Sequence, residues 1–187
     1  MEVFISSENT KLGKIPNISL PPGTTCGNVP CKKDCYANNI VKMYSNAKKR
    51  WQENLDVYLK NDLFYFGEIS RYLYENNSTH FRWHVGGDCP DQDYMVEAHV
   101  VAMLNPDVEF LMFTKRFSWT TYSIPKNLHV ILSMWPYLEE PKSSLPKAWV
   151  RGDPRTPKET FKCEGICTDC LYCWSHNPKL DILLKGH

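Results

Sequence analysis

The 187-residue chain has almost no net charge, no long apolar run and no repeated or low-complexity segment. Its 22 Lys and Arg residues against 21 Asp and Glu residues give a formal charge of +1, so no whole-chain basic field drives sequence-independent nucleic-acid binding. No window approaches 18 uncharged apolar residues, and residues 1–17 hold no signal-peptide-like apolar core. We therefore expect a cytoplasmic protein with no membrane partner and no nucleic-acid ligand.

Three common motifs are also missing: the P-loop, the GxGxxG dinucleotide fingerprint and HExxH. The chain is instead rich in aromatic residues, with 6 Trp, 10 Tyr and 8 Phe, and it has 8 Cys. The aromatic content excludes disorder for most of the chain, and the length predicts one domain over residues 1–187. Without a secretion signal, the cysteines point to metal binding or catalysis rather than to disulfides.

Helical periodicity appears in three segments. Between Tyr36 and Lys60 apolar residues recur at spacings of three and four, which predicts one long amphipathic helix. A second helix is expected from Asp62, as the capping residue, to a stop at Asn76. Residues 93–104 predict a third helix, which Asn105-Pro106 would close.

Short apolar or alternating runs between these helices predict strands of a parallel sheet. They are residues 18–20, 81–85, 108–113, 128–132 and 148–150. We expect an α/β fold with a parallel sheet over residues 18–153 and helices outside the sheet. A cysteine-rich cluster segment over residues 154–187 would follow it.

Four cysteines of that last segment, Cys163, Cys167, Cys170 and Cys173, have the spacing C-x3-C-x2-C-x2-C. Successive C-x2-C steps are typical of loops that offer several thiolates to an iron-sulfur cluster, whereas zinc sites usually pair two such steps across a longer insert. We expect an iron-sulfur cluster here. The alternatives are a zinc site and, as a purely structural interpretation, inert or disulfide-forming thiols.

A second group, Cys26, Cys31 and Cys35, follows the first expected strand with the spacing C-x4-C-x3-C. Three ligands without an obvious fourth suggest a cluster with one iron left open, and buried apolar thiols are the alternative. Cys89 would close this cluster as a fourth ligand or stand apart as a lone thiol, and we favour the lone thiol.

Polar residues follow the expected strands, where ligands of parallel sheets bind. The candidates for cofactor binding are Gly86, Gly87, Asp88, Lys115, Arg116 and Ser133. The catalytic candidates are His84, Asp88 and Lys115, because an imidazole titrates near neutrality and an aspartate suits an ammonium group. Strands commonly end in such turn residues, so each alone also has a structural interpretation.

The order of these motifs resembles the opening half of a radical SAM barrel, and it resembles still more the small phage-encoded iron-sulfur proteins of the gene-product-eighty-eight type. The resemblance covers residues 18–175 and implies a partial (βα) barrel, radical-SAM-like, over residues 18–153. It rests on Ile18–Leu20 leading into Cys26, on Cys35–Ala37, on His84–Asp88, on Phe113–Lys115, on Ile131–Ser133 and on Cys173-Trp174. Each spacing in the first cysteine loop is one residue longer than the usual radical SAM pattern, and Asp88 stands where Glu is usual.

By that resemblance, Cys26, Cys31 and Cys35 hold a 4Fe-4S cluster whose open iron binds S-adenosylmethionine. Gly86, Gly87 and Asp88 would meet its amino group, and Ser133 would lie near its ribose. The C-terminal cysteines would hold a closed auxiliary cluster. The resemblance implies a bacterial-host cytoplasm and, as partners, an electron donor and a small-molecule or macromolecular substrate.

Three functional hypotheses remain from the sequence. The first is a radical-SAM-type enzyme. The second is a non-enzymatic iron-sulfur protein for electron transfer or interaction, and the third is a zinc-stabilised binding module. The substrate is not predicted, because the loops that would contact it carry no motif.

Overall fold

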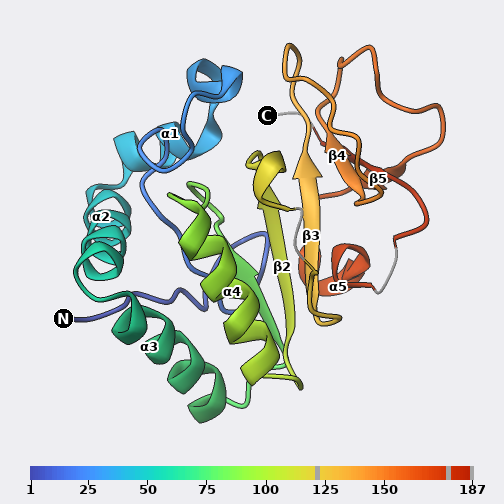
Figure 1. Ribbon diagram of the computed structural model, residues 1–187. Helices are drawn as coiled ribbons and strands as arrows, with labels where there is room; N and C mark the ends of the chain where they lie inside the picture. Colours follow the sequence, from blue (N-terminus) through green and yellow to red (C-terminus); the bar gives the residue numbers. More distant parts are fainter. Residues whose placement is uncertain (121–122, 176–177, 186–187) are drawn as a thin grey trace.

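A computed structural model describes residues 1–120, 123–175 and 178–185. Its sheet has six strands in the order β1-β2-β3-β4-β6-β5, and every neighbouring pair is parallel. The strands are β1 (His80–Trp83), β2 (Glu109–Thr114), β3 (Leu128–Ser133), β4 (Lys147–Trp149), β5 (Phe161–Cys163) and β6 (Ile182–Leu184). The sheet curls into a half-barrel (Figure 1), which confirms the expected α/β class.

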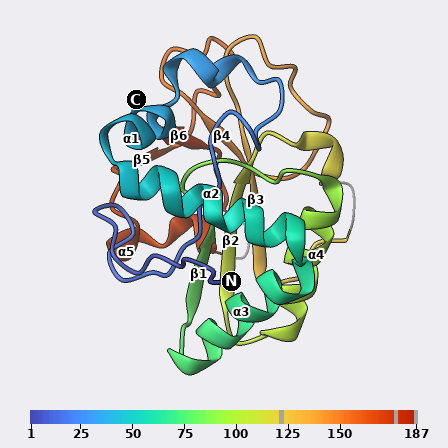
Figure 2. The ribbon, with the colours of Figure 1, turned by 90° about the vertical axis from the view of Figure 1, so that its left-hand side faces the viewer.

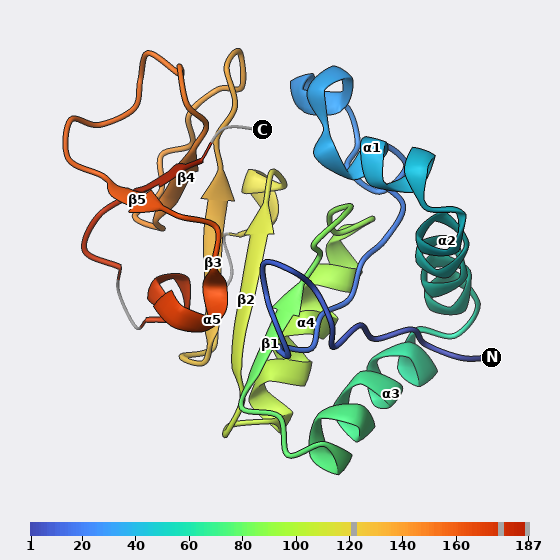
Figure 3. The same cartoon turned by 180° about the vertical axis from the view of Figure 1, so that it is seen from behind.

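Helices cover the two faces of the sheet unequally. The α-helices are α1 (Tyr36–Met43), α2 (Ser45–Lys60), α3 (Asp62–Glu75), α4 (Gln92–Leu104) and α5 (Cys167–Cys170), with 3-10 turns at Pro30–Asp34, Phe117–Trp119 and Tyr172–Trp174. Figure 2 shows α2 and α3 in front of the sheet. Figure 3 shows α5 on the opposite side of β2 from α4. No helix of the described residues is both long enough and apolar enough to cross a bilayer.

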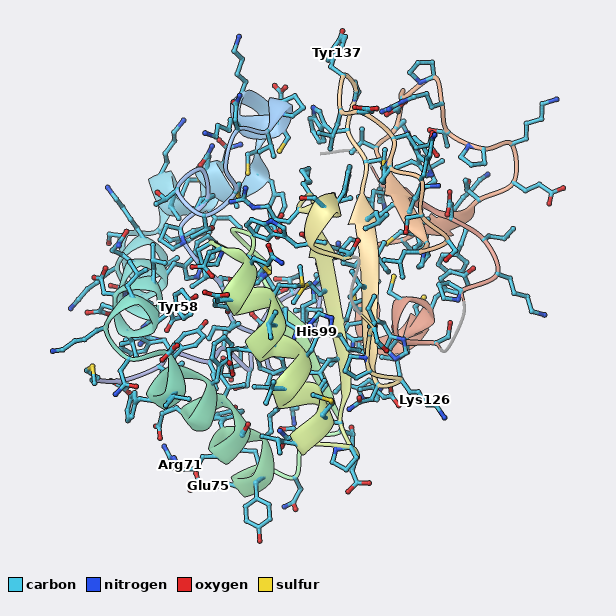
Figure 4. The ribbon with its side chains drawn as sticks, viewed as in Figure 1. Tyr58, Arg71, Glu75, His99, Lys126 and Tyr137 are labelled. Atoms are coloured by element: carbon cyan, nitrogen blue, oxygen red, sulfur yellow. The ribbon has the colours of Figure 1, made fainter. Side chains whose placement is uncertain are left out.

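The main core lies between the sheet and α2, α3 and α4. Alternate residues of β1 and β2 point into it, including Phe81, Trp83 and Phe110, all with no exposed surface. The Tyr58 and Tyr94 rings meet edge to face at 4.9 Å, and Tyr58 lies between α2 and α4 in Figure 4. This aromatic layer anchors the helices on one face and leaves the other face of the sheet for the N-terminal loop and the C-terminal segment.

The predicted helix from Tyr36 to Lys60 is wrong in one respect, because the chain breaks it at Tyr44. That residue is extended, with φ −120° and ψ 98°, and its side chain is exposed. A single extended residue barely disturbs an apolar repeat, so the spacing alone did not reveal the break. The break separates α1, beside the first cysteine loop, from α2, which packs on the sheet.

The helices α3 and α4 confirm the second and third predicted helices, except that a different residue caps α3. Asn61, rather than Asp62, caps α3, because its side chain accepts a hydrogen bond from the Phe64 amide at 2.9 Å. Asp91 caps α4 in the same way through the Tyr94 amide at 2.8 Å. Both side chains satisfy amide groups that have no partner within the helix.

The first expected strand, residues 18–20, is not a strand. The segment runs parallel to β1 through a single bridge between Asn17 and Arg82, and the Ile18 amide donates to the Arg82 carbonyl at 3.2 Å. Regular pairing stops there because His84, at φ 51°, turns the backbone out of the extended region. The segment nevertheless carries the chain along β1 toward the first cysteine loop.

The sheet also extends beyond Asp153, into the segment expected to be a cysteine-rich loop. Both β5 and β6 come from this segment, and β6 inserts between β4 and β5. Three-residue strands have too few residues to show a period, which is why the sequence did not predict them. Cys163 is the last residue of β5, so the sheet itself positions the first thiol of the C-terminal group.

The long proline-rich loop after β3 is braced by ion pairs of Lys147 with Glu140, at 3.0 Å, and of Arg155 with Asp153. Arg155 donates to Asp153 from Nε at 2.9 Å and from Nη2 at 2.6 Å, and also donates to the carbonyls of Leu138 and Trp135. The Arg155 hydrogen bonds hold the pKa of Asp153 below its usual value. The Tyr137 ring, 98 % exposed, stands at the outer end of this loop in Figure 4.

We expect Arg155→Met to lower the free energy of unfolding at pH 7 by about 1.5–3 kcal/mol, because it removes charge-assisted hydrogen bonds. A depressed carboxyl pKa contributes stability above its unfolded value of about 3.9, and that stability is lost as the pH falls through the folded value. The difference between wild type and variant should therefore shrink below about pH 4. Urea unfolding at several pH values measures it, with the exposed Arg151→Met as control. A difference that is the same at every pH would contradict the assignment.

Candidate metal centre

The first cysteine loop is built by a tight turn and a short 3-10 helix. Gly27 has φ 67°, and Pro30 begins the 3-10 turn that ends at Asp34. Cys31 is buried within this turn, whereas Cys26 and Cys35 are half-buried. The loop lies level with the arrowheads of β2 and β3 in Figure 1. The sequence and the fold thus bring three free thiols to the carboxyl edge of the half-barrel.

Asp88 and Lys115 act electrostatically on this loop. Burial raises the pKa of the Cys26 and Cys31 thiols; the Asp88 charge adds to that rise, and the Lys115 charge opposes it. Cys35 also acts on both thiols. The three cysteines therefore lie close enough to share one electrostatic environment, with one cation and one anion of the strand ends beside them.

The Asp88 carboxylate is tied to the chain itself. Its Oδ1 accepts hydrogen bonds from the Cys89 amide and the Thr114 hydroxyl, and its Oδ2 accepts from the Lys115 amide, each at 2.8 Å. Its own amide donates to Thr25 Oγ1 at 3.1 Å. Burial raises the pKa of Asp88, and the hydrogen bonds oppose that rise. Asp88 thus joins the end of β1 to the end of β2 and to the residue before Cys26.

Lys115, Ser133 and Arg116 also meet at this edge. Lys115 Nζ donates to Ser133 Oγ at 2.9 Å, which links the ends of β2 and β3. Arg116 donates to the carbonyls of Cys89 at 3.1 Å and Thr25 at 2.6 Å. Lys115 therefore holds its charge near the loop thiols, and Arg116 binds backbone carbonyls that shape the loop.

Gly86 and Gly87 allow close contacts that a side chain would prevent. A Cβ on Gly86 would lie 2.4 Å from the Trp51 ring. Gly87 has φ 82°, and a Cβ there would lie 2.6 Å from the Leu20 carbonyl oxygen. Both glycines thus have a packing role in holding the end of β1 against α2 and the segment before the cysteine loop.

The C-terminal thiols lie on the face of the sheet opposite α2–α4. Cys163, Cys167 and Cys173 pack against a small core of Leu111, Ile131 and neighbouring residues. Burial raises the pKa of Cys167, and it raises that of Cys173 to about 12. Cys170 is exposed. The spacing predicted four thiols in one group, and the structure places three of them against the sheet and the fourth at the surface.

Arg82 lies on the same face and acts electrostatically on the C-terminal thiols. It is 9 % exposed, and its guanidinium lies 4.2 Å from the centre of the Phe113 ring. Burial lowers its pKa, whereas Tyr36 of α1 and the thiols of Cys167 and Cys173 favour its charged form. The Tyr36 hydroxyl, next to Cys35, donates to the Val85 carbonyl. A buried cation thus lies near the C-terminal thiols and near Tyr36, which follows Cys35 in the sequence.

His84 and Cys89 lie deeper, toward the helices. His84 Nε2 is 3.1 Å from the Tyr94 hydroxyl, and burial lowers the His84 pKa to about 3. Cys89 has no exposed surface and contacts Met112 through sulfur at 3.8 Å. Burial also raises the pKa of Cys89. His84 is therefore a neutral imidazole at physiological pH, and Cys89 belongs to the main core.

Sequence reasoning missed three residues that shape this region. Thr25 and Thr114 supply the hydroxyl groups that hold Asp88, and Arg82 supplies the buried charge. Arg82 did leave a signal, since it is a cation between the apolar residues Phe81 and Trp83 of a buried strand. The two threonines left none, because threonines beside strand ends are common.

The comparisons with known proteins identify the family. A model of the family described as Gene product 88 matches residues 5–150, which is more than half of the chain. No curated protein and no solved structure was found to match. The matched residues include the first cysteine loop, Asp88, Lys115 and Ser133. The chain therefore belongs to the Gene product 88 family.

Proposed function

We propose that the chain is an iron-sulfur protein that holds a 4Fe-4S cluster through Cys26, Cys31 and Cys35. The observation that carries this proposal is the placement of three free thiols from one loop at the carboxyl edge of a parallel half-barrel. That edge is where such sheets bind ligands, because the loops there converge. Thiolates are the usual protein ligands of iron-sulfur clusters.

The described thiols of neither cysteine group are gathered as closely as a single zinc ion would hold them. Zinc–sulfur bonds of about 2.3 Å place the sulfurs of a tetrahedral site roughly 3.8 Å apart. Among the described residues, no three thiols of either cysteine group lie within 4.8 Å of one another. A cluster that places its ligands at separate corners needs wider spacing. The donor set is thus compatible with a cluster, and zinc remains the outcome that would contradict it.

The chain's own residues would shield and balance a cluster at this edge. Lys115, held by Ser133, places a positive charge beside the thiolates of Cys26 and Cys31. Arg116 fixes the loop through the Thr25 carbonyl. A 4Fe-4S cluster supplies one-electron chemistry when bound. The three-thiol set leaves one iron without a protein ligand, and S-adenosylmethionine is the ligand we propose for it.

We further propose an auxiliary cluster at Cys163, Cys167, Cys170 and Cys173. Support comes from the thiols' shared electrostatic environment, in which Cys163 and Cys170 both act on Cys167 and Cys173. The nearby Arg82 cation would offset the negative charge of a thiolate-bound cluster. Tyr36, which follows the last thiol of the first group, also acts on Arg82, and we propose an electron-transfer role for the auxiliary cluster.

The experiment is anaerobic reconstitution followed by iron, sulfide and zinc analysis and electron paramagnetic resonance of the reduced protein. We expect iron and sulfide in equal amounts. The triple Cys26→Ser, Cys31→Ser, Cys35→Ser variant should lose one cluster and keep the other. A four-serine variant of the C-terminal group is the matched control and should show the reverse loss. Zinc without iron, or iron unchanged in both variants, would overturn the proposal.

Adding S-adenosylmethionine to the reduced protein separates the enzymatic from the non-enzymatic version. A spectral change that depends on Cys26, Cys31 and Cys35, together with reductant-dependent formation of 5'-deoxyadenosine, supports a radical-SAM-type enzyme. Intact clusters without either response support electron transfer or interaction instead.

A further inference from the structure

One group of metal-binding atoms in this structure belongs to neither cysteine group. His84, Asp88 and Cys89 are all buried, and one ligand atom from each lies within 4.8 Å of the other two. They are the only three such donors in this arrangement among the described residues. An imidazole, a carboxylate and a thiol are the three ligand types that zinc takes from proteins.

Each of the three side chains keeps a coordination position that the protein does not use. His84 contacts Tyr94 through Nε2, and its Nδ1 is buried without a hydrogen-bond partner. Asp88 uses three of the roughly four acceptor positions of a carboxylate, and the unused one is on Oδ2. The Cys89 thiol donates a weak hydrogen bond to Met112 Sδ, and its sulfur lone pairs accept no hydrogen bond from the residues that the structure describes. A buried unpartnered nitrogen is costly, and a bound ion would remove that cost.

The surroundings hold these side chains as a metal site does. The Tyr94 hydroxyl, which contacts His84, is itself 2.8 Å from the Tyr65 hydroxyl. Metal-binding histidines generally have such a partner on the second ring nitrogen, which fixes the ring. The hydrogen bonds of Asp88 fix its carboxylate in the same way. The site therefore needs little rearrangement to accept an ion.

The sulfur of Met112 lies beside the Cys89 thiol. Met112 Sδ lies 3.8 Å from Cys89 Sγ, close to the roughly 3.8 Å between two sulfurs on one tetrahedral ion with 2.3 Å bonds. Soft sulfur ligands with an imidazole select zinc-like or copper-like ions over calcium or magnesium. A thiolate and a carboxylate also neutralise a divalent cation. The free-energy cost of burying the neutral complex is therefore much lower than that of burying the separate charges.

We propose that His84, Asp88 and Cys89 bind a single zinc-class divalent ion, with Met112 beside the fourth position. On binding, the Cys89 thiol releases its proton to solvent and the thiolate forms the metal–sulfur bond. The site is closed and buried, so its role is to lock the end of β1, from which Asp88 reaches the cysteine loop. This proposal is independent of the iron-sulfur assignment, since it uses none of the seven cysteines assigned there.

The test is titration of the metal-free full chain with Co²⁺, which replaces zinc and gives a visible thiolate-dependent absorption. Cys89→Ala and His84→Gln should each bind one Co²⁺ fewer per chain than wild type. His99→Gln, which alters another buried histidine outside the three-donor group, is the matched control and should keep this ion. X-ray absorption of Co²⁺ in wild type, compared with Cys89→Ala, should show that the additional ion has nitrogen and oxygen ligands and one or two sulfur ligands. Equal Co²⁺ binding by wild type and Cys89→Ala would overturn the proposal.

Because Cys89 is in the core, its variant is also compared by thermal unfolding. Zinc should raise the melting temperature of wild type and of His99→Gln, since it binds the folded chain, and should raise that of Cys89→Ala and His84→Gln less. A zinc-induced rise of the same size in Cys89→Ala would contradict the site even if the variant is destabilised. If the Cys26, Cys31 and Cys35 variants lose iron but keep the ion at His84, Asp88 and Cys89, the two proposals are independent.

Discussion

Replacing Asp88 with alanine is expected to lower the free energy of unfolding of the metal-free protein by about 3–5 kcal/mol. The carboxylate accepts hydrogen bonds from the Cys89 amide, the Thr114 hydroxyl and the Lys115 amide. Alanine leaves these donors buried and unpaired, and each such donor costs about 1–3 kcal/mol, partly recovered by relaxation. The effect is large because one side chain joins the ends of β1 and β2.

Urea unfolding in the presence of a chelator measures this effect, so that no bound ion contributes. Asp93→Ala, an exposed carboxylate in the first turn of α4, is the matched control and should change stability by about 0.5 kcal/mol or less. If Asp88→Ala destabilised the protein no more than Asp93→Ala, the carboxylate would not be the link between the strand ends.

The second large effect is expected at Gly87. Gly87→Ala should destabilise the protein by about 3 kcal/mol, from two sources that add. A non-glycine residue at a positive φ costs roughly 1–2 kcal/mol, and Gly87 has φ 82°. The new Cβ would also lie 2.6 Å from the Leu20 carbonyl oxygen, and relieving that overlap must move the backbone that leads to Cys26.

Gly152→Ala separates the two sources. Gly152 has φ 90°, and a Cβ there would have no neighbour within 4 Å. This variant should show only the conformational cost of about 1–2 kcal/mol. Gly87→Ala should in addition make the loop thiols react faster with an alkylating reagent, because the loop is displaced. Equal destabilisation by the two variants, with unchanged thiol reactivity, would mean that the close contact with Leu20 does not constrain the loop.

Several elements could be predicted because their residues encode them locally. The alternating residues around Trp83 and the apolar runs of β2 and β3 appear as strands close to the expected bounds, and α4 begins and ends within one residue of its prediction. The break at Tyr44 and the strands β5 and β6 were not predicted. A one-residue break and three-residue strands are set by what they pair with, since local sequence periods need longer segments.

The candidate site was likewise predicted only in part. Spacing alone separated the cysteines into two groups, and the expected parallel sheet implied that Asp88, Lys115 and Ser133 gather at one edge, as they do. Nothing in the spacing implied that Asp88 would be held by the protein's own donors. Nor did it imply that the C-terminal thiols pack on the opposite face of the sheet, near the buried Arg82.

The sequence by itself determined the chemistry available to this protein and the class of its fold. The residue types, the cysteine spacings and the alternation of helical and strand periods are local properties, and they predict a parallel α/β sheet with two thiol groups. Only the tertiary structure decided which donors meet. Cys89 lies beside Met112, from the next strand, His84 lies near Asp88 and Cys89, and Thr25 lies beside Asp88, because sheet register and burial bring together residues whose separation along the chain carries no signal.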